Sequence, residues 1–123
     1  MKAKALLGEL REANLVGEVT GARRSYAVFE GPRYYVVVTF STAVAGNFTL
    51  IDKKAVDYVR SAFAGKKDLT SVELLRRIKK RKYARERFDA LYILHILEAS
   101  GEATRRTAKA PARGFLFSLR RRR

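Results

Sequence analysis

Residues 69–101 read LTSVELLRRIKKRKYARERFDALYILHILEASG, and this stretch sets the organisation of the chain. Thr70 and Glu73 have the spacing of a capping box, so a helix is expected to begin there. Between residues 76 and 87 the stretch is strongly basic. From Phe88 it becomes apolar nearly all round, as in a helix buried on most of its faces, and Gly101 is the residue type that commonly closes such a helix.

Acids do not balance the basic part of this stretch. Glu73 and Glu86 are too few to pair with its cations at helical spacing. A solvated helix face is one interpretation of such a charge run. The local imbalance favours the other interpretation, an anionic partner. The cations are Arg76, Arg77, Lys79, Lys80, Arg81, Lys82, Arg85 and Arg87.

The overall composition agrees with an anionic partner. The chain has 123 residues, which suits one domain over residues 1–119 followed by a basic tail at 120–123. Lys and Arg number 27 against 12 acids, a net charge of +15, and there are 13 Tyr and Phe residues. Cations beside aromatic rings favour nucleic acid as the partner.

Other features of the composition bear on location and source. The sequence has no Cys, which excludes disulfides and thiolate metal sites and favours a cytoplasmic protein, including one associated with the nucleoid. No apolar stretch is long enough for a membrane span or a signal peptide, so we expect a soluble protein with no membrane partner. Trp and Gln are absent and Lys, Arg and Glu are frequent, which favours a thermophilic source.

The N-terminal half predicts one helix and a small antiparallel sheet. The helix is expected over residues 1–14, and strands over 15–20, 26–29, 33–41 and 47–50. In the third strand the even-numbered residues 34–40 form the more apolar face, which we assign to the core. The odd-numbered residues 33–41 form a mixed face, which is either ordinary half-exposed sheet or a platform on which bases stack.

The C-terminal half predicts three helices and a hairpin. The helices run from about Asp52 to Gly65, from Thr70 to about Lys80 and from about Ala84 to Ser100, and the hairpin strands span 102–107 and 115–119. The fold class is therefore α+β, a small antiparallel sheet packed on a helical layer, with a winged-helix-like C-terminal helix and hairpin. In a winged helix the third helix enters the major groove of duplex DNA, as in a regulator or chromatin protein. Asn and Gln, which read adenine, are missing from that helix, so binding independent of sequence is expected.

A second arrangement uses the same residues to bind a single strand. Between the sheet and the helices, a cleft with aromatic walls and a basic rim would stack unpaired bases and neutralise phosphates. A protein that binds structured RNA by shape is a third reading. We favour single-stranded DNA or RNA without marked sequence preference, and expect no small-molecule substrate. The candidate contacts are Arg23, Arg24, Arg33, Tyr35, Lys79, Lys80, Arg81, Lys82, Tyr83, Arg85, Arg105 and Arg106.

The layout resembles that of a known family. An aromatic N-terminal sheet, YYVVVTF at 34–40, is followed by a basic helical segment from KKDLTS at 66–71 to KKRKY at 79–83 and by a Leu-rich helix. This order is similar to that of the Thermo-DBP family and its relatives, archaeal single-strand-binding proteins without an OB-fold. The resemblance implies single-stranded DNA binding between sheet and helices. The leucine zipper of the longer members is absent, so a homodimer would need another surface.

Residues suited to catalysis are few. His95 is the only histidine and lies in an apolar run, where a core imidazole is the expected role. Asp52-Lys53-Lys54 faintly resembles a metal-dependent nuclease motif, but Asp52 is better placed as a helix cap. We therefore expect no enzymatic activity, no metal and no cofactor.

Overall fold

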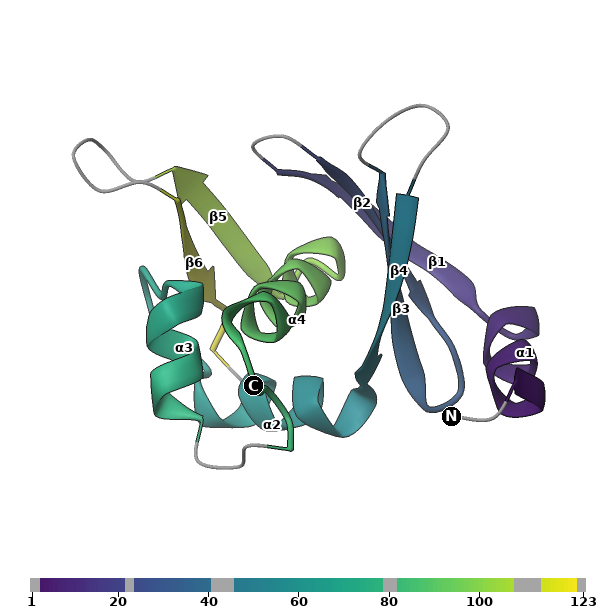
Figure 1. The fold of residues 1–123 in the computed structure, drawn as a ribbon. Coiled ribbons are helices and arrows are strands. Elements are labelled where there is room, and N and C mark those ends of the chain that lie inside the picture. The colour runs from purple at the N-terminus through teal and green to yellow at the C-terminus, as the bar shows by residue number, and fades with distance from the viewer. Residues whose placement is uncertain (1–2, 22–23, 41–45, 79–81, 108–113, 122–123) are drawn as a thin grey trace. The chain divides into compact units, whose positions relative to one another are not determined.

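The computed structural model describes residues 3–21, 24–40, 46–78, 82–107 and 114–121. Over these residues the protein has four helices, a four-stranded antiparallel sheet and a two-stranded sheet (Figure 1). The predicted α+β class is confirmed. The chain divides into two compact units, Met1–Lys53 and Lys54–Arg123, and the single domain over 1–119 stays a prediction. Each unit is described by itself.

The first unit is a helix followed by a four-stranded meander. Each strand pairs with the next along the chain, in the order β1-β2-β3-β4, and all four predicted strands are confirmed with boundaries shifted by one or two residues. Val37 at the centre pairs with Val28 on one side and Thr49 on the other. The elements are α1 (Ala3–Arg11), β1 (Asn14–Thr20), β2 (Ser25–Glu30), β3 (Tyr34–Phe40) and β4 (Gly46–Asp52).

The two faces of this sheet differ in burial. One face carries most of the buried residues of the sheet, which are Val19, Tyr26, Val28, Tyr35, Val37, Thr39 and Ile51. On the other face Val36 is buried at the centre, but Leu15, Phe40 and Phe48 are exposed. The predicted core face of β3 is therefore wrong. The odd-numbered residues, which were assigned to the mixed face, are the more buried ones.

Helix α1 is fixed by a buried carboxylate. Glu9 is only 6 % exposed, and its two oxygens accept hydrogen bonds from the backbone N–H of Arg33 at 3.1 Å and of Tyr34 at 3.3 Å. A buried carboxylate needs such donors, and the turn between β2 and β3 supplies them. The helix was predicted correctly, but Leu7 and Leu10 of its apolar stripe are exposed.

The second unit contains three helices and a hairpin, in the predicted order. The predicted helix start at Thr70 is confirmed, because its Oγ1 accepts a hydrogen bond from the N–H of Glu73 at 3.0 Å. The glycines at 65 and 101 have φ of +78° and +80°, the left-handed conformation in which glycine is favoured after a helix. The elements are α2 (Lys53–Ala62), α3 (Ser71–Arg77), α4 (Arg87–Ala99), β5 (Ala103–Thr107) and β6 (Phe115–Leu119).

The core of the second unit is built on α4. Ala90 and every residue from Ile93 to Leu97 are buried, as the all-round apolar pattern predicted. The segment before α3 pairs with the hairpin: Leu69 and Phe117 exchange two backbone hydrogen bonds, of 2.7 and 2.9 Å. This bridge ties the start of α3 to β6. Assignment of the unit as a winged helix stays a prediction.

Candidate nucleic-acid interface

Positive charge is concentrated in the second unit. Residues 54–123 hold 20 of the 27 Lys and Arg residues and seven of the 12 acids, which gives +13 of the net charge of +15. Residues 1–53 therefore carry only +2. An anion would be attracted mainly to the second unit.

All seven acids of the second unit already have partners. Four arginines take five of them: Arg60 pairs with Asp57 and Glu102, Arg77 with Glu73, Arg105 with Glu98, and Arg106 with Asp68. The other two, Glu86 and Asp89, form the capping box of α4. Within the described part of the unit, this leaves a set of exposed cations that form no ion pair with these acids: Lys66, Lys67, Arg76, Lys82, Arg85, Arg87, Arg120 and Arg121.

The connection into α4 is shaped by its cap. Asp89 accepts hydrogen bonds from the backbone N–H of Arg85 at 2.9 Å and of Glu86 at 3.3 Å. The carboxylate thus binds the backbone of this connection, while the side chains of Arg85 and Arg87 are exposed. These hydrogen bonds hold the backbone from which the two exposed arginine side chains extend.

Aromatic rings accompany these cations on both sides of the cap. The Lys82 ammonium lies 5.3 Å from the centre of the Tyr83 ring, which is itself 5.4 Å from the ring of Tyr58. The Arg87 guanidinium lies 5.6 Å from the centre of the Phe88 ring, and Phe88 is 46 % exposed. We call residues Lys82–Phe88 the α4 entry segment. It combines cations with ring faces, the pairing that single-strand binding needs.

Phe88 was missed by the sequence analysis. It was taken as the start of the apolar part of a helix expected from about Ala84, but α4 begins at Arg87, so Phe88 lies in the first turn and is exposed. The signal that could have found it is the capping box at Glu86 and Asp89, which places the residues between them at the helix start.

The hairpin arginines have structural partners. Arg105 has a side chain only 17 % exposed, its Nε donates to Glu98 Oε2 at 3.0 Å, and its guanidinium lies 4.2 Å from the centre of the Phe115 ring. These contacts give Arg105 a structural role, and its predicted contact with nucleic acid stays a prediction. Arg106 is exposed, although its Nε donates to Asp68 Oδ1 at 3.0 Å.

His95 has the core position expected of it. The imidazole is completely buried, its Nδ1 is 3.1 Å from Glu98 Oε1, and the rings of Phe115 and Phe117 meet it edge-on. Glu98 thereby joins His95 of α4 to Arg105 of β5. The cluster fastens the hairpin to α4.

The predicted site residues of the first unit differ in exposure. Arg24 and Arg33 are exposed, but Tyr35 is only 7 % exposed, so the prediction that its ring lies off the core is wrong. The four strands contain no Lys or Arg, although they contain three acids, Glu18, Glu30 and Asp52. Predicted contacts Arg23, Lys79, Lys80 and Arg81 lie outside the described residues.

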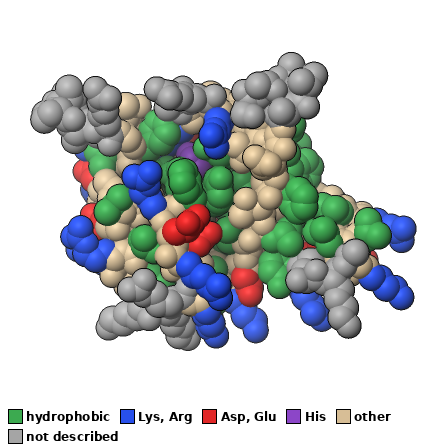
Figure 2. Space-filling view, viewed as in Figure 1, with side chains coloured by type: hydrophobic (Ala, Val, Ile, Leu, Met, Phe, Trp, Pro, Cys, Tyr) green, Lys and Arg blue, Asp and Glu red, His purple; other side chains and the backbone are tan. Residues whose placement is uncertain are grey.

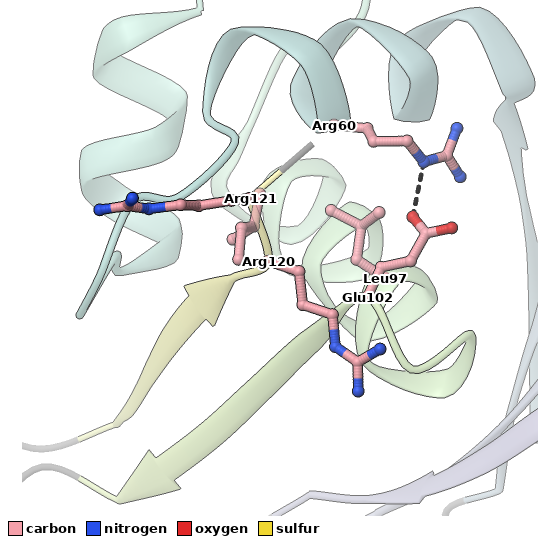
Figure 3. Close-up of a pocket in the computed structure, with 6 residues that line it drawn as sticks. Arg60, Leu97, Glu102, Arg120 and Arg121 are labelled. Atoms are coloured by element: carbon pink, nitrogen blue, oxygen red, sulfur yellow. Dashed lines mark hydrogen bonds and ion pairs between the residues drawn. The ribbon is translucent and has the colours of Figure 1, made fainter. Parts of the chain in front are cut away.

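A pocket of about 170 Å³ in the second unit is lined by three arginines, but these do not form an anion site. Arg60 is directed at Glu102, and the side chains of Arg120 and Arg121 extend in different directions (Figure 3). Leu97 and Leu119 contribute apolar walls. Because the three guanidinium groups do not converge, the pocket offers no common point for a phosphate.

Comparison of the chain with family models, curated proteins and solved structures gives no match. The likeness to the Thermo-DBP family, and the archaeal source that it implies, therefore stay predictions. None of the helices in the described ranges is both long enough and apolar enough to cross a membrane.

Proposed function

We propose that this protein binds single-stranded nucleic acid, DNA or RNA, without marked sequence preference, through the α4 entry segment and the cations around it. The observation that supports this most is the charge of the second unit. Its net charge is +13, and all of its acids are engaged in ion pairs or in the α4 cap. Such an excess repels itself and is relieved by a polyanion.

In this proposal cations and rings have separate roles. Lys82, Arg85 and Arg87 neutralise phosphates, while Tyr83 and Phe88 offer faces on which bases stack. Each base that stacks on an aromatic ring contributes about 1–3 kcal/mol, whatever the base. Lys79, Lys80 and Arg81 add three further charges next to this segment in the sequence.

A winged helix that binds duplex DNA is the second candidate. The order of three helices and a hairpin, together with the pairing of Leu69 with Phe117, favours it. The burial of α4 argues against it, because a helix that enters the major groove must present an exposed polar face. In α4 only Arg87 and Phe88 are exposed, and residues 93–97 are all buried.

Fluorescence anisotropy tests the choice. A labelled oligonucleotide of about 20 nucleotides, longer than a typical single-strand site, is titrated as a single strand and as a duplex over a range of salt. We expect tighter binding to the single strand, with log affinity falling by about 0.7 per phosphate neutralised for each unit of log salt. Tighter binding to the duplex would move the proposal to the winged helix. A preference for a folded RNA competitor would favour recognition of RNA shape instead. A cytoplasmic location and the absence of catalysis stay predictions.

A further inference from the structure

The first unit exposes an apolar face of its sheet. Leu15, Phe40 and Phe48 are 59 %, 49 % and 53 % exposed. Together with the half-buried residues beside them they form what we call the open sheet face, defined by Leu15, Phe29, Val38, Phe40, Phe48 and Leu50. In the space-filling view hydrophobic side chains gather over the sheet and toward α1 (Figure 2). Exposed apolar patches of this kind mark interaction surfaces.

The register makes this face continuous across all four strands. Leu15 pairs with Phe29, Phe29 with Val36, and Val36 with Leu50, so one apolar row crosses the sheet. In a neighbouring row Val38 pairs with Phe48. Phe40 opens a further row, and its ring reaches over β4, since a Cβ built at Gly46 would lie 3.6 Å from the Phe40 ring.

Nucleic acid is a poor occupant for this face. Bases could stack on Phe40 and Phe48, but the phosphates of the nucleic acid would meet no cation on the sheet, because no Lys or Arg occurs in β1–β4. The Asp, Glu, Lys and Arg side chains that β1–β4 place on this face are two acids, Glu18 and Asp52. They would repel phosphate, so the face suits a protein surface better.

Charge also selects which protein surface fits. Two copies that met through their second units would bring together two surfaces of +13, whereas two copies that met through their first units would bring together +2 and +2. The first unit also contains five of the seven large hydrophobic side chains that are exposed in the described residues. We propose that the open sheet face is a self-association surface, on which the same face of a second copy packs in a two-fold dimer.

The geometry sets the expected strength. Two sheets that pack face to face lie about 10 Å apart and interdigitate their side chains. Four strands about 4.8 Å apart and seven residues long form a face of roughly 19 by 23 Å, or about 400 Å². Stable interfaces bury about 800 Å² per partner, so we expect a weak dimer that dissociates on dilution.

Sedimentation equilibrium of the full chain, freed of nucleic acid and kept at high salt, tests this proposal. We expect the average mass to rise from one chain toward two between low and high micromolar concentration. Phe48→Glu should raise the dissociation constant about tenfold or more, because it removes a ring from the interface and buries a charge. The matched control is Val72→Glu on α3, which changes an apolar side chain of similar exposure, 48 %, by the same charge.

The outcomes are distinct. A wild-type chain that stays monomeric at every concentration overturns the proposal, as does an equal loss of association in Phe48→Glu and Val72→Glu. If circular dichroism finds Phe48→Glu unfolded, Phe40→Ser replaces it, and unchanged association in a folded variant also overturns the proposal. Because no nucleic acid is present, this result is independent of the proposed nucleic-acid binding.

Discussion

The two units of this chain expose different chemistry. Residues 1–53 have a net charge of +2 and strands without Lys or Arg, whereas residues 54–123 have +13. Among the residues that the structure describes, the first unit has five exposed large hydrophobic side chains and the second has two, Val72 and Phe88. Charge and exposed apolar surface are thus largely separated along the chain. The separation suits a protein in which one unit attracts a polyanion while the other provides a surface for protein contacts.

A second contrast lies within the basic unit, between arginines that hold the fold and those left for a ligand. Arg60, Arg77, Arg105 and Arg106 are paired with acids. Arg85 and Arg87 are exposed, and the nearby acid Asp89 accepts hydrogen bonds from backbone N–H groups of the helix cap instead of pairing with these arginines. The total of 20 Lys and Arg residues in this unit therefore overstates the number of cations available to phosphates, because four of the arginines are paired with acids.

The comparison of the units is tested most strongly by removing cations from each in turn. The triple variant Lys82→Ala, Arg85→Ala, Arg87→Ala should lose about 3 kcal/mol of binding free energy for single strands, or about 100-fold in affinity, at roughly 1 kcal/mol per phosphate contact. Its salt slope should fall by about 2, at about 0.7 per phosphate. Anisotropy titrations measure both quantities.

The matched control removes three exposed cations from the first unit, Lys4, Arg11 and Arg24. It lowers the net charge by the same amount and should change affinity only slightly, because these cations lie outside the proposed interface. Equal losses of affinity in the two triple variants would show that net charge alone determines binding, and would contradict the assignment of binding to the second unit.

Much of this fold could be predicted from local sequence patterns. Thr70 and Glu73 predicted a helix start, and alternation predicted four strands, because caps and side-chain period act between neighbours in the sequence. The buried face of β3 was assigned wrongly for a physical reason. Both of its faces carry large apolar side chains, and burial depends on cross-strand neighbours such as Val28 and Ile51, whose register no single strand reveals.

The candidate site was less predictable. Arg105 and Arg106 are adjacent and look alike in the sequence, yet alternation in β5 directs one to Glu98 and the Phe115 ring and the other to Asp68. The partners lie on other elements, so the sequence could not distinguish a structural arginine from an available one. To find Phe88 as an exposed ring, the true start of α4 had to be known, and this start is set by the capping box of Glu86 and Asp89 on either side of Phe88.

The two hairpin arginines offer the next test. Arg105→Ala should lower the free energy of unfolding by about 2–3 kcal/mol, because it leaves the largely buried Glu98 without its cation. Arg106→Ala removes an exposed ion pair and should cost less than about 1 kcal/mol. Urea denaturation compares the two. Similar losses, or weaker binding to single strands by folded Arg105→Ala, would contradict a structural role for Arg105.

Two exposed phenylalanines separate base stacking from apolar exposure. Phe88→Ala should weaken binding to oligo(dT) by about 1–2 kcal/mol, or roughly 5- to 30-fold, through the loss of one stacked base. Phe48→Ala changes a ring of similar exposure, 53 % against 46 %, on the sheet and should leave affinity unchanged. Anisotropy at a fixed salt concentration gives the comparison, and equal effects would mean that exposed rings in general, rather than the α4 entry segment, bind bases.

The smallest expected effect is on stability, and it concerns the contact between α1 and the sheet of the first unit. Glu9→Gln keeps the size of the side chain and one acceptor oxygen. It removes the negative charge that strengthens the hydrogen bonds from the N–H groups of Arg33 and Tyr34, so the free energy of unfolding should fall by about 1 kcal/mol. Glu12→Gln, an exposed change of the same charge in the same region, should be neutral within about 0.5 kcal/mol. Urea denaturation measures both, and equal effects would mean that charge in this region, and not the hydrogen bonds of Glu9, matters for stability. Neither change should alter affinity for single strands, because both leave the second unit intact; a gain in affinity with either variant would show that acids of the first unit act on the same polyanion.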